Sequence, residues 1–236
     1  MMRQLTFLED LILPPRAEPE EARDFLRPLE KYGAVIGTDE VGRGALAGPV
    51  VACAVSLTPE QEERLIELGL KDSKRLSPKK REMIFGAMEE MKVKWRAFKA
   101  SNKFIDQNNI LNASLSAMRE SVLKLAGDID GKISCVVVDG INELPELGLK
   151  QWALIRADDL VPCVSAASVA AKVLRDRLMI KMSSLYPDYG FEKNKGYPTM
   201  NHMETVKRLG LTDEHRLTFC RKILQERGNF NAADKR

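Results

Sequence analysis

Histidine and cysteine are scarce in this sequence, and their spacing argues against two common kinds of site. The chain has 236 residues, of which 2 are histidine and 4 are cysteine. No two cysteines form the Cys-x-x-Cys pair that structural zinc sites and redox motifs use. The cysteines are scattered, three of them within apolar stretches: Cys53, Cys135, Cys163 and Cys220. We therefore predict reduced thiols, without disulfides or zinc, in a cytosolic protein.

Long apolar runs are also missing, and the net charge is small. No run approaches the roughly 20 apolar residues that cross a bilayer. Acidic residues interrupt the apolar N-terminus, so we expect no signal peptide, no membrane contact and a cytoplasmic location. A formal net charge of +3 does not by itself indicate nucleic acid. Two basic clusters would alone be typical of solvated helix faces: Lys71, Lys74, Arg75, Lys79, Lys80 and Arg81, and Lys193, Lys195, Lys207 and Arg208.

Apolar patterning divides the chain into a strand-rich first part and a helix-rich last part. Strands are predicted at residues 34–39, 48–57, 93–100, 133–139 and 152–158. Helices are predicted at residues 78–91, 105–126 and 165–185, followed by a Gly/Pro turn and two shorter helical patterns. Ser77 and Pro78 supply an N-cap and a first-turn proline for the first of these helices. This order predicts a mixed α/β sheet with a helical C-terminal region.

Three of the predicted strands end in a carboxylate, at Asp39, Asp139 and Asp158. One acid at a strand end is ordinary, because loops are polar, but three together are harder to explain as loop residues. If strands 34–39 and 133–139 are parallel, Asp39 and Asp139 lie at the same edge of the sheet. Clustered carboxylates repel one another unless a cation neutralises them, and oxygen ligands favour Mg²⁺ or Mn²⁺. Two such ions about 3.5–4 Å apart can support phosphodiester hydrolysis.

Glu40 directly follows Asp39, and this adjacency poses a geometric problem. Neighbouring residues of a strand point to opposite faces, so both carboxylates reach one site only if the strand breaks there. Val41-Gly42 directly afterwards would permit such a break.

A glycine-rich stretch, residues 42–48, follows the first predicted strand and loosely resembles a dinucleotide-binding loop. Two observations argue against that interpretation. Asp39 and Glu40 would place negative charge where a pyrophosphate should rest, and the next segment is a strand rather than a helix. A flexible hairpin turn is one alternative. The other, which we favour, is a loop whose bare backbone approaches a ligand closely and senses a sugar 2′-hydroxyl.

Several motifs, in order along the chain, make this sequence similar to the ribonuclease HII family. The resemblance runs from about residue 25 to 220 and rests on these segments: Gly37–Gly44 (GTDEVGRG), Leu46–Val50, Leu70–Ser77 (LKDSKRLS), Ile105-Asp106 with Asn109–Leu111, Val138–Gly140, Ser165–Ser168, Ala171–Val173, Arg175-Asp176, Asn194–Thr199 (NKGYPT), His202, and His215-Arg216. The resemblance implies an α/β fold of ribonuclease H type, a mixed β-sheet flanked by helices with a helical C-terminal region. It also implies four parts: an extension at 1–24, a catalytic domain at 25–185, a helical region at 186–226 and a tail at 227–236.

The resemblance also implies an activity and roles for particular residues. Asp39, Glu40, Asp139 and Asp158 would hold two ions, Mn²⁺ or Mg²⁺. The enzyme would cut the phosphodiester on the 5′ side of ribonucleotides, in RNA–DNA hybrids and in duplex DNA with embedded ribonucleotides, leaving 3′-hydroxyl and 5′-phosphate ends. Such an activity belongs to ribonucleotide excision repair and DNA replication. The implied substrate contacts are Gly42, Arg43 and Gly44 at the 2′-hydroxyl, Tyr197 on the sugar of the following deoxynucleotide, and Ser73 and Lys74 at phosphates.

The chain departs from the family pattern in three places. The fourth acid lies in Arg156-Ala157-Asp158-Asp159, where counting back from Ser165 selects Asp158 and leaves Asp159 as the second choice. Residues 1–24 exceed the family core and receive no role. The tail at 227–236 lacks the aromatic pair that docks onto a sliding clamp, so we expect a monomer without that partner.

Two other functions, and some blander roles for single residues, remain open at this stage. A ribonuclease HIII would carry an additional N-terminal domain and lack Gly-Arg-Gly, and an inactive hybrid-binding protein would not need all four acids. Taken alone, Tyr197 is typical of a packing anchor, and the two histidines are typical of satisfied structural residues. Lys172 and Arg175 share a helix face that either contacts phosphate or is solvated. The small residues at 165–168 favour close packing of a helix on the sheet.

Overall fold

The computed structural model describes the backbone of residue 31 and residues 33–233. Side chains are described as far as residue 225. The predicted extension at residues 1–24 lies outside the described residues, and so do the side chains of the predicted tail at 227–236.

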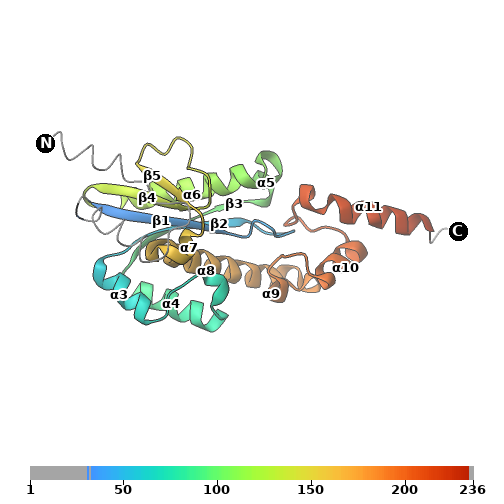
Figure 1. Ribbon diagram of the computed structural model, residues 1–236. Coiled ribbons are helices and arrows are strands. Elements are labelled where there is room, and N and C mark those ends of the chain that lie inside the picture. Colours follow the sequence, from blue (N-terminus) through green and yellow to red (C-terminus); the bar gives the residue numbers. More distant parts are fainter. Residues whose placement is uncertain (1–30, 32, 234–236) are drawn as a thin grey trace.

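One mixed five-stranded sheet forms the centre of the molecule (Figure 1). The strand order is β3-β2-β1-β4-β5. β1 pairs in parallel with β4, and β4 with β5, whereas β2 pairs antiparallel with both β1 and β3. The strand bounds are Ala34–Val41 for β1, Val50–Ser56 for β2, Lys94–Ala100 for β3, Ile133–Asp139 for β4 and Gln151–Leu154 for β5. The prediction of a mixed α/β sheet is confirmed.

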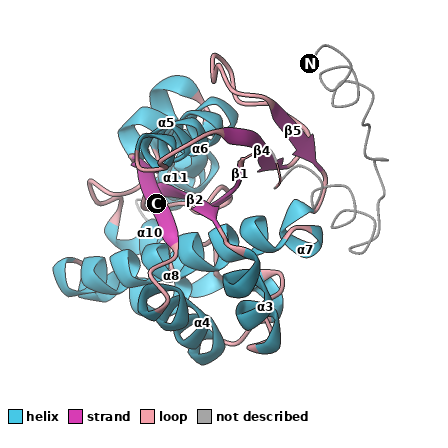
Figure 2. Cartoon of the chain, turned by 90° about the vertical axis from the view of Figure 1, so that its left-hand side faces the viewer, coloured by secondary structure: helices cyan, strands magenta, loops and turns pink. Residues whose placement is uncertain are grey.

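Helices cover both faces of this sheet, and others extend past one end of it (Figures 1 and 2). On one face α6 packs against β2 and β3, and on the other α8 packs against β1 and β2. The helices are α3 (Pro59–Glu67), α4 (Pro78–Glu90), α5 (Asn102–Asn108), α6 (Ile110–Gly127), α7 (Ala157–Leu160), α8 (Pro162–Leu185), α9 (Phe191–Asn194), α10 (Met200–Leu209) and α11 (Leu217–Ala233). Ser77 caps α4 by accepting a hydrogen bond from the Lys80 amide, as predicted.

Two predicted elements are wrong in a similar way, because one residue in each has a positive φ. The helix predicted over 105–126 is two helices, since Asn109 has φ of 62° and caps α6 through its side chain. The strand predicted over 152–158 stops at Leu154, because Arg156 also has φ of 62° and turns the chain into α7. Asp158 therefore lies on a short helix rather than at the end of a strand.

Close packing of α8 on β1 brings the chemistry of these two elements together. A Cβ added at Gly37 of β1 would lie 2.4 Å from the Val164 amide nitrogen, so only glycine allows this approach. The small side chains of residues 165–168 are buried in the same contact, as the sequence predicted. Pro162 starts α8 three residues before the predicted beginning, because proline suits the first turn of a helix.

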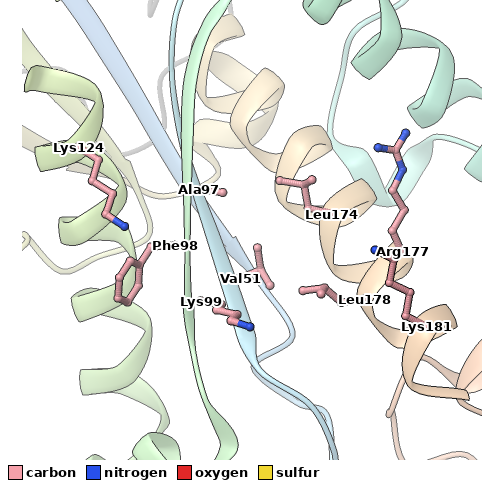
Figure 3. Close-up of a pocket in the computed structure, with 9 residues that line it drawn as sticks. All are labelled: Val51, Ala97, Phe98, Lys99, Lys124, Leu174, Arg177, Leu178 and Lys181. Atoms are coloured by element: carbon pink, nitrogen blue, oxygen red, sulfur yellow. The ribbon is translucent and has the colours of Figure 1, made fainter. Parts of the chain in front are cut away.

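The remaining features of the fold are the state of the cysteines and a cavity away from the predicted acids. All four cysteines are buried and none forms a disulfide, and no described helix is long and apolar enough to cross a bilayer. A cavity of about 680 Å³ opens at the outer edge of the sheet, between β3 and α8 (Figure 3). It is lined by Val51, Ala97, Phe98, Lys99, Lys124, Leu174, Arg177, Leu178 and Lys181. None of the predicted catalytic acids borders it, so the cavity is separate from the site described next.

Candidate active site

Three buried or half-buried carboxylates converge at one end of the sheet. Asp39 on β1, Asp139 at the end of β4 and Asp158 on α7 each offer an oxygen atom, and these atoms lie within 4.8 Å of one another. The parallel register of β1 and β4 pairs Thr38 with Val138, so the following aspartates lie side by side. The Asp158 amide approaches Asp139 Oδ1 at 3.4 Å. The predicted meeting of Asp39 and Asp139 at one sheet edge is confirmed.

Glu40 lies next to this group without belonging to it. Strand β1 continues through Val41, so the break that the sequence analysis required is absent and Glu40 is not among the three converging acids. Its carboxylate forms an ion pair of 3.2 Å with Arg43, and its side chain is only 6% exposed. Glu40 still feels the charge of Asp139, which is one of the causes that raise its pKa.

The pKa values of these acids show that their charge is poorly compensated. Burial, together with the charges of Glu40 and Asp139, raises the pKa of Asp39 well above its usual range. Burial also raises the pKa of Glu40 to about 7, against the opposing effect of Arg43. Burial and the charge of Asp158 raise the pKa of Asp139 to about 6. A bound divalent cation would relieve this repulsion, and an all-oxygen set of donors fits a hard ion such as Mg²⁺ or Mn²⁺.

The segment Asp72–Lys74 contacts the acids through the side chain of Lys74. Lys74 Nζ donates to Asp158 Oδ2 at 3.2 Å, and that charge opposes the effect of burial on the pKa of Asp158. Ser73 is 2% exposed, and its hydroxyl lies 2.9 Å from the Ser168 hydroxyl on α8. Lys74 therefore lies beside the acids, whereas the Ser73 side chain faces the protein interior.

Asp158, and not its neighbour Asp159, joins the other acids. Asp159 turns away and pairs with Arg156 and with Arg75, 3.6 Å away. This geometry favours the fourth acid that was selected by register.

The glycine loop joins β1 to β2 directly, so no helix follows it and a dinucleotide site is ruled out. Gly42 has φ of +105°, and a Cβ there would lie 2.2 Å from Arg175 Nε. A Cβ at Gly44 would meet no atom within 4 Å, so the loop is open to the outside at that residue. The loop thus combines a packed inner side with an open outer side.

Two arginines hold the inner side of this loop, a role that no sequence pattern indicates. Arg175 and Arg216 are fully buried, and both donate to backbone carbonyl groups. Both predicted environments of Arg175, a phosphate contact or a solvated face, are wrong. Lys172 is also held within the protein, where it pairs with Asp176 at 2.7 Å.

Tyr197 is half-buried beside the same loop. The Arg175 guanidinium lies 5.2 Å from the centre of the Tyr197 ring. The Tyr197 backbone carbonyl lies 2.9 Å from His202 Nδ1. His202 Nε2 lies 3.1 Å from His215 Nε2, and the Thr212 amide donates to His215 Nδ1. Burial lowers the pKa of both histidines, that of His215 to about 4. Both histidines are buried structural residues, as predicted.

Comparison with known proteins decides the family. A family model described as Ribonuclease HII matches residues 36–223. The chain belongs to the ribonuclease HII family. It is 44% identical over 187 residues to the Ribonuclease HII of Shewanella piezotolerans, an alignment covering 79% of this chain and 88% of that relative. The chain is accordingly a ribonuclease H of type 2, a metal-dependent endoribonuclease.

Solved structures agree with this assignment. The ribonuclease H2 from Pyrococcus horikoshii OT3 superposes with a TM-score of 0.66 at 28% identity, covering 82% of this chain and 98% of that one. Bst-RNase HIII in complex with Mn²⁺ gives a TM-score of 0.70 at 19% identity, covering 82% of this chain and 70% of that one. The second likeness shows the shared fold alone. The predicted ribonuclease H-like architecture is confirmed.

Proposed function

We propose that this enzyme hydrolyses the phosphodiester on the 5′ side of ribonucleotides, both in RNA–DNA hybrids and in duplex DNA with embedded ribonucleotides. The observation that carries the proposal is the group of three acids, Asp39, Asp139 and Asp158, whose oxygen atoms lie within 4.8 Å of one another. Membership of the ribonuclease HII family supports the choice of substrate. The products would be 3′-hydroxyl and 5′-phosphate ends.

The proposed metal ligands are Asp39, Asp139 and Asp158, together with the adjoining Glu40. Mn²⁺ or Mg²⁺ bound there would supply an activated water and stabilise the leaving oxygen, the two roles that a pair of ions can serve in phosphodiester hydrolysis. The carboxylates would hold the ions, and Glu40 would add negative charge from the adjoining position on β1. The structure of Bst-RNase HIII in complex with Mn²⁺, which shares this fold, supports a divalent ion.

Substrate contacts are proposed on the sides of the acid group. Lys74, 3.2 Å from Asp158, would bind a phosphate close to the cut. The Gly42–Gly44 loop would meet the ribose 2′-hydroxyl from its open side, where no atom fills the space beside Gly44. Arg43, whose side chain is 53% exposed, can reach a phosphate, and the half-buried Tyr197 offers a ring face to the next sugar. Ser73 would contribute through its backbone, because its side chain is buried.

A cleavage assay tests the proposal directly. A labelled DNA duplex with one ribonucleotide is incubated with the enzyme in Mn²⁺, in Mg²⁺ and in excess chelator, beside an all-DNA duplex of the same sequence. We expect a single nick 5′ to the ribonucleotide, only with metal and only in the ribonucleotide-containing duplex. Binding without any cleavage in either metal would instead favour an inactive hybrid-binding protein.

Organisation and assembly are further parts of the proposal. We expect residues 25–185 to form the catalytic domain and residues 186–226 a helical region that completes the site, since Arg216 contacts the glycine loop. We expect a cytoplasmic monomer that acts in ribonucleotide excision repair and DNA replication without a clamp-binding tail. Light scattering on the purified protein measures the oligomeric state, and a clamp-capture assay tests the tail.

A further inference from the structure

Two buried arginines lie under the glycine loop without an acidic partner. Arg175 and Arg216 are both 0% exposed, and no described carboxylate lies within 4.0 Å of either guanidinium. Asp176 pairs with Lys172 and Arg81, and Asp106 accepts hydrogen bonds from the start of α11. Burying an unpaired charge is costly, so an arrangement of this kind needs a compensating set of polar groups.

Backbone carbonyls provide that compensation. Arg216 donates to the carbonyls of Gly42, Arg43 and Gly48, with distances of 2.8 to 3.0 Å. Arg175 donates to Pro49 at 3.0 Å, to Ala47 at 3.2 Å and to Lys195 at 2.9 Å. The planar guanidinium, with five N–H groups in a fixed fork, can hold several carbonyls in one orientation. A lysine keeps the charge but lacks the fork.

Holding these carbonyls inward has a direct consequence for the outer side of the loop. A peptide unit is planar and trans, so its C=O and N–H groups point in opposite directions. With the carbonyls of Gly42 and Arg43 turned toward Arg216, the amides of Arg43 and Gly44 point away from it. A Cβ at Gly44 would meet no atom within 4 Å, so the Gly44 amide lies at the open side of the loop, where a hydroxyl acceptor could be recognised.

Arg175 connects this loop to the segment that carries Tyr197. It bonds both the loop, at Ala47 and Pro49, and Lys195, and its guanidinium lies over the Tyr197 ring. The two segments also touch directly, because the Leu46 amide donates to the Gly196 carbonyl at 2.7 Å. A Cβ at Gly196 would lie 2.4 Å from the Ala47 carbonyl oxygen, so the contact is close.

We propose that Arg175 and Arg216 are positioning residues for substrate recognition. Arg216 orients the amides of Arg43 and Gly44 toward the ribose, and Arg175 fixes Tyr197 relative to that loop, so that a ribonucleotide and the deoxynucleotide after it are read as one unit. This inference rests on the proposed function, and it adds the residues that make recognition rigid. Neither arginine touches substrate.

The first experiment measures recognition without cleavage. In the Asp39→Asn background, fluorescence anisotropy gives Kd for a one-ribonucleotide duplex and for the matching all-DNA duplex. We expect Arg216→Lys to remove most of the preference for the ribonucleotide. The control Arg177→Lys, at an exposed arginine of α8 that pairs with Glu82 of α4, should retain it. An unchanged preference in Arg216→Lys, or no preference in the parent protein, would overturn the inference. Failure of cleavage alone would overturn only the proposed function.

The second experiment separates positioning from loss of fold. It compares kcat and KM on a single-ribonucleotide duplex, which contains the junction, and on a full RNA–DNA hybrid. We expect Arg175→Lys to lower kcat on the junction substrate by on the order of 10- to 100-fold relative to the hybrid, the effect of a misplaced recognition group. Tyr197→Ala should give the same bias, and the double variant little more, because both act through one contact. An equal loss on both substrates would mean a purely structural role and would overturn the inference.

Discussion

Two buried clusters of opposite charge lie at the same end of this sheet, and they are balanced in different ways. The acids Asp39, Asp139 and Asp158 repel one another, and the pKa of each is raised. The arginines Arg175 and Arg216 make hydrogen bonds to six carbonyl groups. Burial lowers the pKa of both, and the charge of Arg175 also lowers that of Arg216. The acidic cluster can accept a ligand, whereas the basic cluster is held by carbonyl groups and serves as a fixed support.

This difference predicts opposite responses to the removal of charge. Neutralising an acid removes repulsion and should not harm folding, although it removes a metal ligand. Neutralising an arginine leaves several buried carbonyls without donors, so it should cost stability. Substitutions in the two clusters therefore distinguish a ligand-accepting cluster from a structural one.

Asp39→Asn should have the largest effect. We expect cleavage to fall about a thousandfold or more, because metal-assisted charge stabilisation is worth several kcal/mol. Duplex binding should persist, since the carboxylate repels phosphates, and the metal-free variant should melt no lower than the wild type. Rates in Mn²⁺, anisotropy and calorimetry measure the three quantities. Loss of binding together with cleavage would mean that Asp39 is structural.

Arg216→Met should lower the free energy of unfolding by roughly 3 kcal/mol or more, since each unsatisfied buried carbonyl costs about 1–3 kcal/mol. Urea titration followed by circular dichroism measures the change. Arg177→Met is the matched control, because its half-exposed pair with Glu82 should contribute under about 1 kcal/mol. Equal effects of the two substitutions would contradict the difference between the clusters.

The pH dependence should expose the repulsion among the acids. The folded-state pKa values of Asp139, about 6, and Glu40, about 7, lie above their ordinary values of 3.8 and 4.5. The folded state therefore binds more protons between these limits, and metal-free stability from these groups falls as pH rises from about 4.5 to 7. The buried histidines oppose this trend below pH 6.5, because the pKa values of both are lowered in the folded state.

A paired measurement removes the histidine contribution. The melting temperatures of wild type and Asp139→Asn are compared in chelator at pH 7.5 and at pH 5.5. We expect the variant to be the more stable protein at pH 7.5 and the advantage to shrink at pH 5.5. A constant difference would show that Asp139 is not strained by its neighbours.

Asp159→Asn should have the smallest effect. Asp159 pairs with Arg156 and Arg75 and stays outside the acid group, so cleavage should remain within about twofold of wild type. The same assay as for Asp39→Asn applies. A loss comparable to that of Asp158→Asn would restore Asp159 as the fourth acid.

Sequence reasoning reached the acids because strands and carboxylates leave a clear pattern. Parallel pairing of two apolar runs brought Asp39 and Asp139 together, as predicted. Asp158 lies in the site because the left-handed Arg156 turns the chain into the short helix α7. No periodicity of the sequence indicates that turn. The strand break expected at Glu40 is absent, because β1 keeps its pairing with β2 through Val41.

The arginine support was beyond sequence reasoning for a physical reason. Its partners are backbone carbonyls, which every residue carries and which leave no mark in the sequence. Arg216 meets the carbonyl of Gly42, 174 residues earlier, and Arg175 meets that of Pro49, 126 residues earlier. Only the folded chain shows that the arginine just before α11 and one within α8 are partners of the glycine loop.

The long separation between Gly42 and Arg216 has a consequence for biosynthesis. Strands β1 and β4 and helix α7, which carry the acids, are complete once residue 160 has left the ribosome. The glycine loop acquires its support only after residue 216 follows. The elements that carry the acids are therefore synthesised before the residue that supports the ribose-reading loop, and selection of a ribonucleotide requires both parts of the chain. The last described helix, α11, begins at the very next residue after Arg216.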